Sequence, residues 1–215
     1  MKQSTPTKTR RPQGGRPTPA RAAQIERLLL DAAARLFLAE GYGVTSMEAI
    51  AREAGIAKRT LYLRYRDKAA LFNAVILQVI EKLRPAGAED LFKGKNFEDI
   101  LQRLVKTILR ASLTPEALAM QRLILAEASR FPELAAVVHQ VGARDQAVRH
   151  IAALLEREKK MAAADAVFAA DQLLYMITAG PQRRALVEGK PMNESELEAW
   201  AKKTVRLFLE GCGAA

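Results

Sequence analysis

The chain has 215 residues, of which 49% are hydrophobic and 27% charged, and its formal net charge at pH 7 is +10. This composition is too apolar for a disordered chain, and no uncharged apolar run reaches the roughly 18 residues that a membrane-spanning helix needs. The single cysteine, Cys212, excludes a disulfide framework and a cysteine-based zinc site, and it favours a reducing cytoplasm.

The positive charge is concentrated at the front of the chain. Residues 1–21 carry +6, residues 22–85 carry +3 and residues 86–215 carry only +1. Such asymmetry indicates that the front of the molecule meets a polyanion, either nucleic acid or an anionic membrane surface. A basic, solvated tail is the third explanation. The lack of large apolar residues in residues 1–24 counts against membrane binding.

Residues 1–19 are predicted to form a disordered basic arm, because four prolines and two adjacent glycines lie there among polar residues. The tripeptide Gly15-Arg16-Pro17 resembles the core of an AT-hook, whose arginine lies in the narrow minor groove of A·T-rich DNA. If the arm binds DNA, Arg16 is the residue that reads the groove. A solubilising tail is the alternative.

Beyond the arm, apolar residues recur with the period of a helix, and no run alternates as a strand would. The sequence therefore predicts an all-α fold. The first amphipathic helix ends near Gly41 and presents an apolar face made of Ile25, Leu28, Leu29, Ala32, Ala33, Leu36 and Phe37. Asn96, Thr114 and Asn193 are predicted N-caps of later helices.

Residues 41–68 contain the polar and cationic side chains that are candidates for binding a partner. Thr45 and Glu48 match a capping box, which predicts a short helix after Thr45. Gly55 then supplies a tight turn, and a second short helix covers about residues 57–65, with Leu61 and Tyr65 facing inward. The side chains left mostly outward are Lys58, Arg59, Thr60, Tyr62 and Arg64.

Two short helices joined by a tight turn form a helix-turn-helix, whose second helix fits the major groove of DNA. Cations, hydroxyl groups and a tyrosine on that helix can bond phosphates and base edges. Asp67 is predicted to cap the next helix, which places Lys68 at a helix N-terminus and predicts a phosphate site. A solvated helical hairpin with incidental charges is the alternative.

The same segment resembles the DNA-binding domain of the TetR family of bacterial transcriptional regulators. The resemblance covers about residues 22–72 and is carried by Gly41-Tyr42, Thr45-Ser46, Ile50-Ala51, Ala54-Gly55-Ile56, Thr60-Leu61-Tyr62, Tyr65, Lys68 and Leu71. It implies that Thr45, Tyr62 and Lys68 contact phosphates and that Arg59 and Thr60 reach base edges. The full set of predicted DNA contacts is Thr45, Ser46, Lys58, Arg59, Thr60, Tyr62, Arg64 and Lys68, with Arg16 of the arm.

The sequence departs from the family pattern at two positions in the second short helix. Ala57 stands where the family commonly has serine, which removes the usual cap of this helix. Leu63 stands where the family commonly has tyrosine or histidine, either of which can contact a phosphate.

The chain is divided by these features into the arm at 1–19, a helix-turn-helix domain at 20–68 and a larger helical domain at 69–215. The near-neutral charge of the larger domain argues against DNA contact. Its run around residues 118–134 also resembles the AefR-like C-terminal subgroup. Its two histidines, His139 and His150, are too far apart to bind one metal, so no metal and no cofactor are expected.

Polar groups on apolar stripes of the larger domain suggest a ligand cavity. The predicted effector-binding residues are Leu104, Ile108, Met120, Ile124, Glu127, Phe168, Gln172 and Tyr175. The alternative is that Glu127 pairs with a nearby arginine and the others are core. Predicted helices over 164–180 and 194–210 match the region where TetR-family proteins dimerise as a four-helix bundle. The predicted dimer-interface residues are Phe168, Met176, Leu197, Trp200, Thr204 and Phe208.

These features together predict a homodimeric, sequence-specific DNA-binding regulator. We expect a repressor that binds a pseudo-palindromic operator and is released by a small apolar effector, with the helix over Leu71–Leu83 as the mechanical link. The alternative is an all-α enzyme that uses Glu127 or Tyr175 as acid or base. No nucleophile–base pair, metal set or phosphate loop supports that alternative, so we expect no enzymatic activity.

Overall fold

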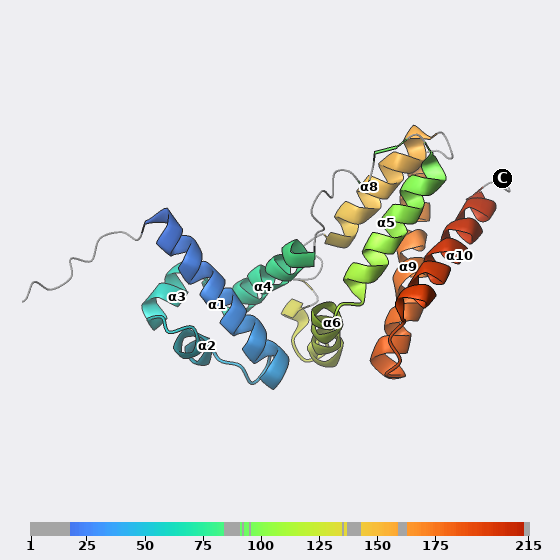
Figure 1. Cartoon of the computed structure of the whole chain (residues 1–215). Helices are drawn as coiled ribbons and strands as arrows, with labels where there is room; N and C mark the ends of the chain where they lie inside the picture. Colours follow the sequence, from blue (N-terminus) through green and yellow to red (C-terminus); the bar gives the residue numbers. More distant parts are fainter. Residues whose placement is uncertain are drawn as a thin grey trace, which may run out of the picture.

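Figure 1 shows a computed structural model of the chain, which describes residues 18–83, 91, 93–94, 96–134, 136, 143–158 and 163–212. The regular elements in these ranges are helices, and none is a strand. The predicted all-α fold is therefore confirmed. Almost all of the predicted basic arm, including Arg16, lies outside the described residues.

Four helices form the unit at left in Figure 1, here called the head. They are α1 (Pro19–Glu40), α2 (Met47–Glu53), α3 (Lys58–Arg64) and α4 (Lys68–Leu83). Helix α1 begins after Thr18, whose side chain accepts a hydrogen bond from the backbone N–H of Arg21. It ends at Gly41, where φ is +93°, as the sequence predicted.

The remaining helices form a larger unit, here called the body. They are α5 (Phe97–Ser112), α6 (Pro115–Glu127), α8 (Ala143–Arg157), α9 (Ala163–Val187) and α10 (Glu194–Cys212). The three predicted N-caps are confirmed. The side chains of Asn96, Thr114 and Asn193 accept backbone N–H groups in the first turns of α5, α6 and α10. None of the described helices is both long and apolar enough to cross a lipid bilayer.

Helix α9 is longer than predicted, because it continues through Pro181 to Val187. Proline inside a helix removes one backbone hydrogen bond and normally ends or kinks the helix. Here Pro181 and Ala185 are both buried, so packing holds the chain helical past the proline. Gly180 lies under the Trp200 ring of α10, which a β-carbon at position 180 would approach to 2.8 Å.

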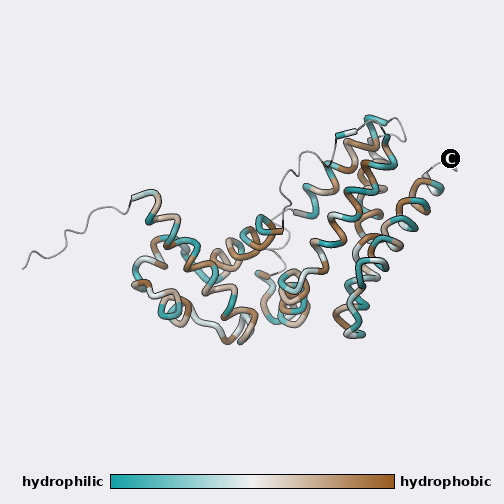
Figure 2. Tube along the Cα trace, viewed as in Figure 1, coloured by the Kyte–Doolittle hydropathy of each residue, from teal (hydrophilic) through white to brown (hydrophobic). Residues whose placement is uncertain are grey.

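The described residues form two main hydrophobic cores. Hydrophobic residues are brown in Figure 2. The first joins α1–α4 to Met120 and Leu123 of α6, and the second joins α5, α8, α9 and α10. Leu71 and Phe72 of α4 are fully buried in the first core. The first half of α4, which follows residue 68, therefore packs in the same core as α1–α3.

Candidate nucleic-acid interface

The helix that precedes the turn starts differently from the prediction. Ser46, and not Thr45, caps α2, and its side chain accepts the N–H of Ala49 at 3.1 Å. Thr45 is buried, and its hydroxyl donates to the carbonyl oxygens of Leu36 at 3.2 Å and Gly41 at 2.7 Å. The predicted capping box is wrong, because this hydroxyl ties the loop to the end of α1 instead.

The turn between α2 and α3 has the predicted geometry. Gly55 adopts φ +67°, where a β-carbon would strain the backbone. No side chain caps α3, as expected from Ala57. Leu61 is fully buried, while Tyr65 is half-buried and its hydroxyl donates to the carboxylate of Glu26 on α1. These inward residues fix which side of α3 faces solvent.

The outward face of α3 is cationic and partly held in place by carboxylates. Lys58, Arg59, Tyr62 and Arg64 are exposed, and Thr60 is half-buried. Glu48 of α2 accepts the Tyr62 hydroxyl at 3.2 Å and pairs with Lys58 Nζ at 3.3 Å. These contacts orient two predicted DNA-binding side chains toward α2.

Hydrogen bonding and charge near Glu48 also change two pKa values. The backbone N–H of Glu48 and then the Lys58 ammonium lower the pKa of the Glu48 carboxyl. Loss of solvent, and then the Glu48 charge, raise the pKa of the Tyr62 hydroxyl. The lowered pKa favours the ionised form of Glu48, and the raised pKa favours the protonated form of Tyr62, in which the hydroxyl is a hydrogen-bond donor.

On the opposite flank, Arg64 pairs with Glu26 of α1 and also donates to the carbonyl oxygen of Ala22 at 3.4 Å. Neither Glu26 nor Glu48 was predicted to shape this surface. Both act across 10 or more residues of sequence, so no local pattern reveals them.

Lys68 lies at the N-terminus of α4, where Asp67 caps the helix by accepting the N–H of Ala70 at 2.7 Å. This cap was predicted. The Lys68 ammonium donates to the carbonyl oxygens of Tyr42 at 2.7 Å, Thr45 at 3.1 Å and Gly43 at 3.3 Å. It also lies 4.4 Å from the centre of the Tyr42 ring, and its burial lowers its pKa. Lys68 therefore holds the loop that leads into α2.

Glu127 joins the body to this same loop. Its two carboxylate oxygens accept the backbone N–H groups of Tyr42 at 2.8 Å and Gly43 at 2.7 Å. The Phe131 ring packs beside them, with its centre 5.3 Å from that of the Tyr42 ring. A β-carbon at Gly43 would lie 2.8 Å from that ring, so only glycine fits there without displacement. Glu127 forms no ion pair with an arginine among the described residues, and its predicted role in effector binding stays a prediction.

Comparison with known proteins identifies this arrangement of helices. The model of the tetR family of bacterial regulatory proteins matches residues 29–75. The model of the AefR-like transcriptional repressor C-terminal domain matches residues 99–213, more than half of the chain. The chain belongs to the TetR family. The matched proteins are helix-turn-helix transcriptional regulators, and the family is not an enzyme family, which argues against the enzyme alternative.

Individual relatives agree with this assignment. A TetR-family transcriptional regulator from Mesorhizobium loti is 30% identical, with a TM-score of 0.73 over 89% of this chain and 98% of that chain. The flavonoid-responsive regulator FrrA is 28% identical, with a TM-score of 0.69 over 88% of this chain and 97% of that one. The transcriptional regulator UidR of Escherichia coli is 31% identical over 51% of this chain and 55% of its own. The chain thus spans about half the length of the curated relatives it matches.

The predicted effector-binding residues of this TetR-family chain do not line one cavity in the described part. Met120 and Ile124 pack in the core of the head, Leu104 packs with Leu154, and Ile108 packs against the core of the body. The three residues of α9 are exposed, namely Phe168, Gln172 and Tyr175. The shared helical period showed only that these residues lie on apolar faces, and it did not show what those faces meet.

The predicted dimer-interface residues differ in how far they are buried in the single chain. Thr204 and Phe208 are buried within the single chain, and Phe208 lies in the core of the body. Three further residues are partly buried and pack against the same core, namely Met176, Leu197 and Trp200. Of the predicted set only Phe168 is exposed, to 67%. Leu207 of α10, which is not in the predicted set, is 62% exposed.

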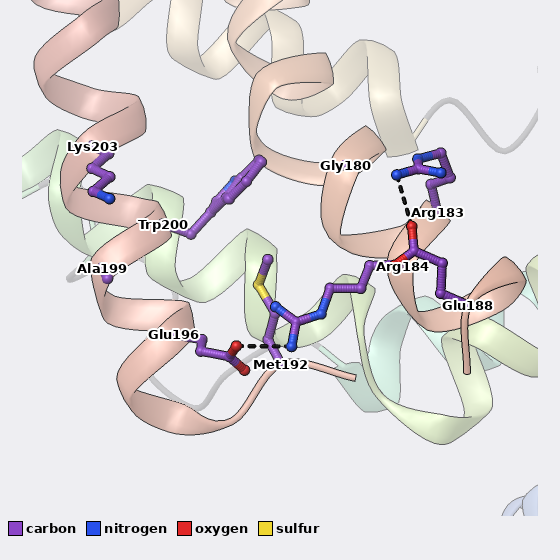
Figure 3. A pocket seen from close by; sticks show the side chains of 9 residues that line it. All are labelled: Gly180, Arg183, Arg184, Glu188, Met192, Glu196, Ala199, Trp200 and Lys203. Atoms are coloured by element: carbon purple, nitrogen blue, oxygen red, sulfur yellow. Dashed lines mark ion pairs between the residues drawn. The ribbon is translucent and has the colours of Figure 1, made fainter. Parts of the chain in front are cut away.

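A groove of about 360 Å³ lies between α9 and α10 (Figure 3). It is lined by Gly180, Arg183, Arg184, Glu188, Met192, Glu196, Ala199, Trp200 and Lys203. Its two arginines are paired within the groove, Arg183 with Glu188 at 2.7 Å and Arg184 with Glu196 at 2.8 Å. The groove does not coincide with the predicted effector site.

Proposed function

We propose that the protein is a homodimeric transcriptional repressor that binds a pseudo-palindromic operator through α3 and leaves it when a small apolar effector binds the body. The cationic face of α3, fixed outward by the buried Leu61, is the observation that carries the DNA-binding mode. The similarity of residues 99–213 to a repressor domain supports the repressor role. The similarity to a flavonoid-responsive regulator supports an apolar effector.

Within the major groove, Arg59 and Thr60 would reach base edges, whereas Lys58, Tyr62 and Arg64 would contact phosphates on the flanks of α3. Ser46 lies at the N-terminus of α2, where the first backbone N–H groups favour an anion such as a phosphate. Arg16 would add a minor-groove contact from the arm. In this proposal Thr45 and Lys68 do not contact phosphates. Their polar groups instead donate to carbonyl oxygens of the loop between α1 and α2.

The dimer in this proposal forms through the outer faces of α9 and α10. These neighbouring helices carry exposed apolar side chains at Val167, Phe168 and Leu207, which water solvates poorly. Packing α9 and α10 against the same helices of a second copy would bury them in a four-helix bundle. Two heads would then present their α3 helices to successive major grooves about 34–36 Å apart.

Glu127 supplies a route from the body to the head. It lies at the C-terminus of α6 and holds the loop that leads into α2, so a shift of α6 moves that loop directly. This route adds to the predicted link through α4, whose first half packs within the head. An effector that favours a shifted α6 would weaken operator binding, and operator DNA must weaken effector binding by the same factor.

Selection of bound fragments from host genomic DNA, followed by affinity measurement, tests the proposal. We expect one pseudo-palindromic sequence bound by two chains, with its half-site centres one helical turn or a multiple of it apart. Arg59→Ala should relax the base preference, whereas Arg149→Ala, which truncates an exposed arginine of α8, should not change it. Failure to bind any duplex even at low ionic strength would refute the proposal.

A further inference from the structure

The side chains of α3 differ in what they contact. Leu61 faces the core of the head, and Lys58 and Tyr62 are held on one flank by Glu48 of α2. Arg64 is held on the other flank by Glu26 of α1. The side chains that point outward between the two flanks are therefore the ones free to enter a groove.

Arg59 and Leu63 are the exposed side chains that remain, and Thr60 beside them is half-buried. Leu63 is 76% exposed, and Arg59 makes no hydrogen bond or ion pair with any residue that the structure describes. They stand four residues apart on the helix, so they lie on one face with their β-carbons about 5–6 Å apart. A cation and a branched aliphatic group thus form a two-residue stripe along the centre of the outward face.

The major groove offers a matching pair of groups. Arginine bonds O6 and N7 of guanine, and the 5-methyl group of thymine is the one apolar group on the edges of the four bases there. Successive base pairs are about 3.4 Å apart along the helix. Two side chains about 5–6 Å apart on α3 can therefore contact base pairs that are one or two steps apart.

We propose that Leu63 is a specificity-determining residue that contacts the methyl group of a thymine in each half-site, one or two base pairs from the guanine bound by Arg59. This inference rests on the proposed function. Leucine cannot donate a hydrogen bond to a phosphate, so its exposed side chain gains free energy at the interface only by burying apolar surface. The thymine methyl supplies such surface at a base edge.

Replacing each operator thymine in turn by uracil tests the inference, because uracil pairs as thymine does and lacks only the methyl group. For the unaltered protein, one thymine position in each half-site should lower the affinity about fourfold when replaced, as expected for one buried methyl. For Leu63→Ala the same replacement should have no effect. The thermal unfolding temperature should not change with Leu63→Ala, because the side chain is exposed.

Leu28→Ala is the matched control, since Leu28 is a half-exposed leucine of α1 in the same head. It should keep the penalty for uracil. The inference is overturned if no thymine shows a penalty, or if Leu63→Ala keeps the penalty and weakens all sequences equally, which would place Leu63 against the sugar backbone. Either result leaves sequence-specific binding intact, so it is distinguishable from failure of the proposed function, in which no operator is bound at all.

Discussion

Replacement of Glu127 by alanine probes the bridge between the body and the head. Its carboxylate accepts two backbone N–H groups, those of Tyr42 at 2.8 Å and Gly43 at 2.7 Å. A hydrogen bond to a charged group contributes about 1.5–3 kcal/mol, and Gly43 is exposed, so water can replace part of this stabilisation. We expect the free energy of unfolding to fall by about 3 kcal/mol, which for a chain of this size lowers the unfolding temperature by about 6–12 °C.

Thermal and urea-induced unfolding measure this effect. Glu127→Gln should show a smaller loss, because its amide keeps one acceptor oxygen but turns an NH₂ group toward the second N–H. Glu133→Gln is the control for charge in the same region. Among the described residues, Glu133 accepts a hydrogen bond only from the Tyr42 hydroxyl, at 3.3 Å, so its replacement should cost less than about 1 kcal/mol. Equal unfolding temperatures for Glu127→Ala and the unaltered protein would refute the reasoning.

Three further variants separate structural from DNA-contacting residues. Lys68→Ala should lower the unfolding temperature by several degrees in a thermal melt, because three loop carbonyl groups lose their donor; an unchanged melt would contradict this. Lys58→Ala should leave the melt unchanged and reduce the slope of log affinity against log salt by about 1, measured with operator DNA; an unchanged slope would remove Lys58 from the phosphate contacts. Gly43→Ala should cost about 1–3 kcal/mol in urea unfolding, because its β-carbon would lie 2.8 Å from the Phe131 ring; unaltered stability would show that the ring moves freely.

Much of the head could be predicted from the sequence because its signals are local. The end of α1 at Gly41, the Gly55 turn, the Asp67 cap and the inward Leu61 each depend on residues within a few positions of one another. Cap preferences and positive φ values act over one or two helical turns, so a sequence pattern reports them directly.

The body was predicted less well because its partners are distant in sequence. Glu127 lies 84 and 85 residues from the two N–H groups that it accepts, and no periodicity encodes that contact. Thr204 and Phe208 follow an apolar stripe that suits a core, a cavity or a dimer interface equally well. Pro181 carries a local signal to end a helix, which the burial of Pro181 and Ala185 overrides.

The sequence by itself determined that the chain is helical, where several helices begin, and that a cationic helix-turn-helix precedes a nearly neutral larger domain. Those features follow from interactions between residues close along the chain. Only the tertiary structure decided which partner each apolar or charged face meets, including the loop carbonyls on Lys68 and the carboxylates that flank α3. A helical stripe specifies the direction in which side chains point, but the surface that they contact depends on how the helices pack in space.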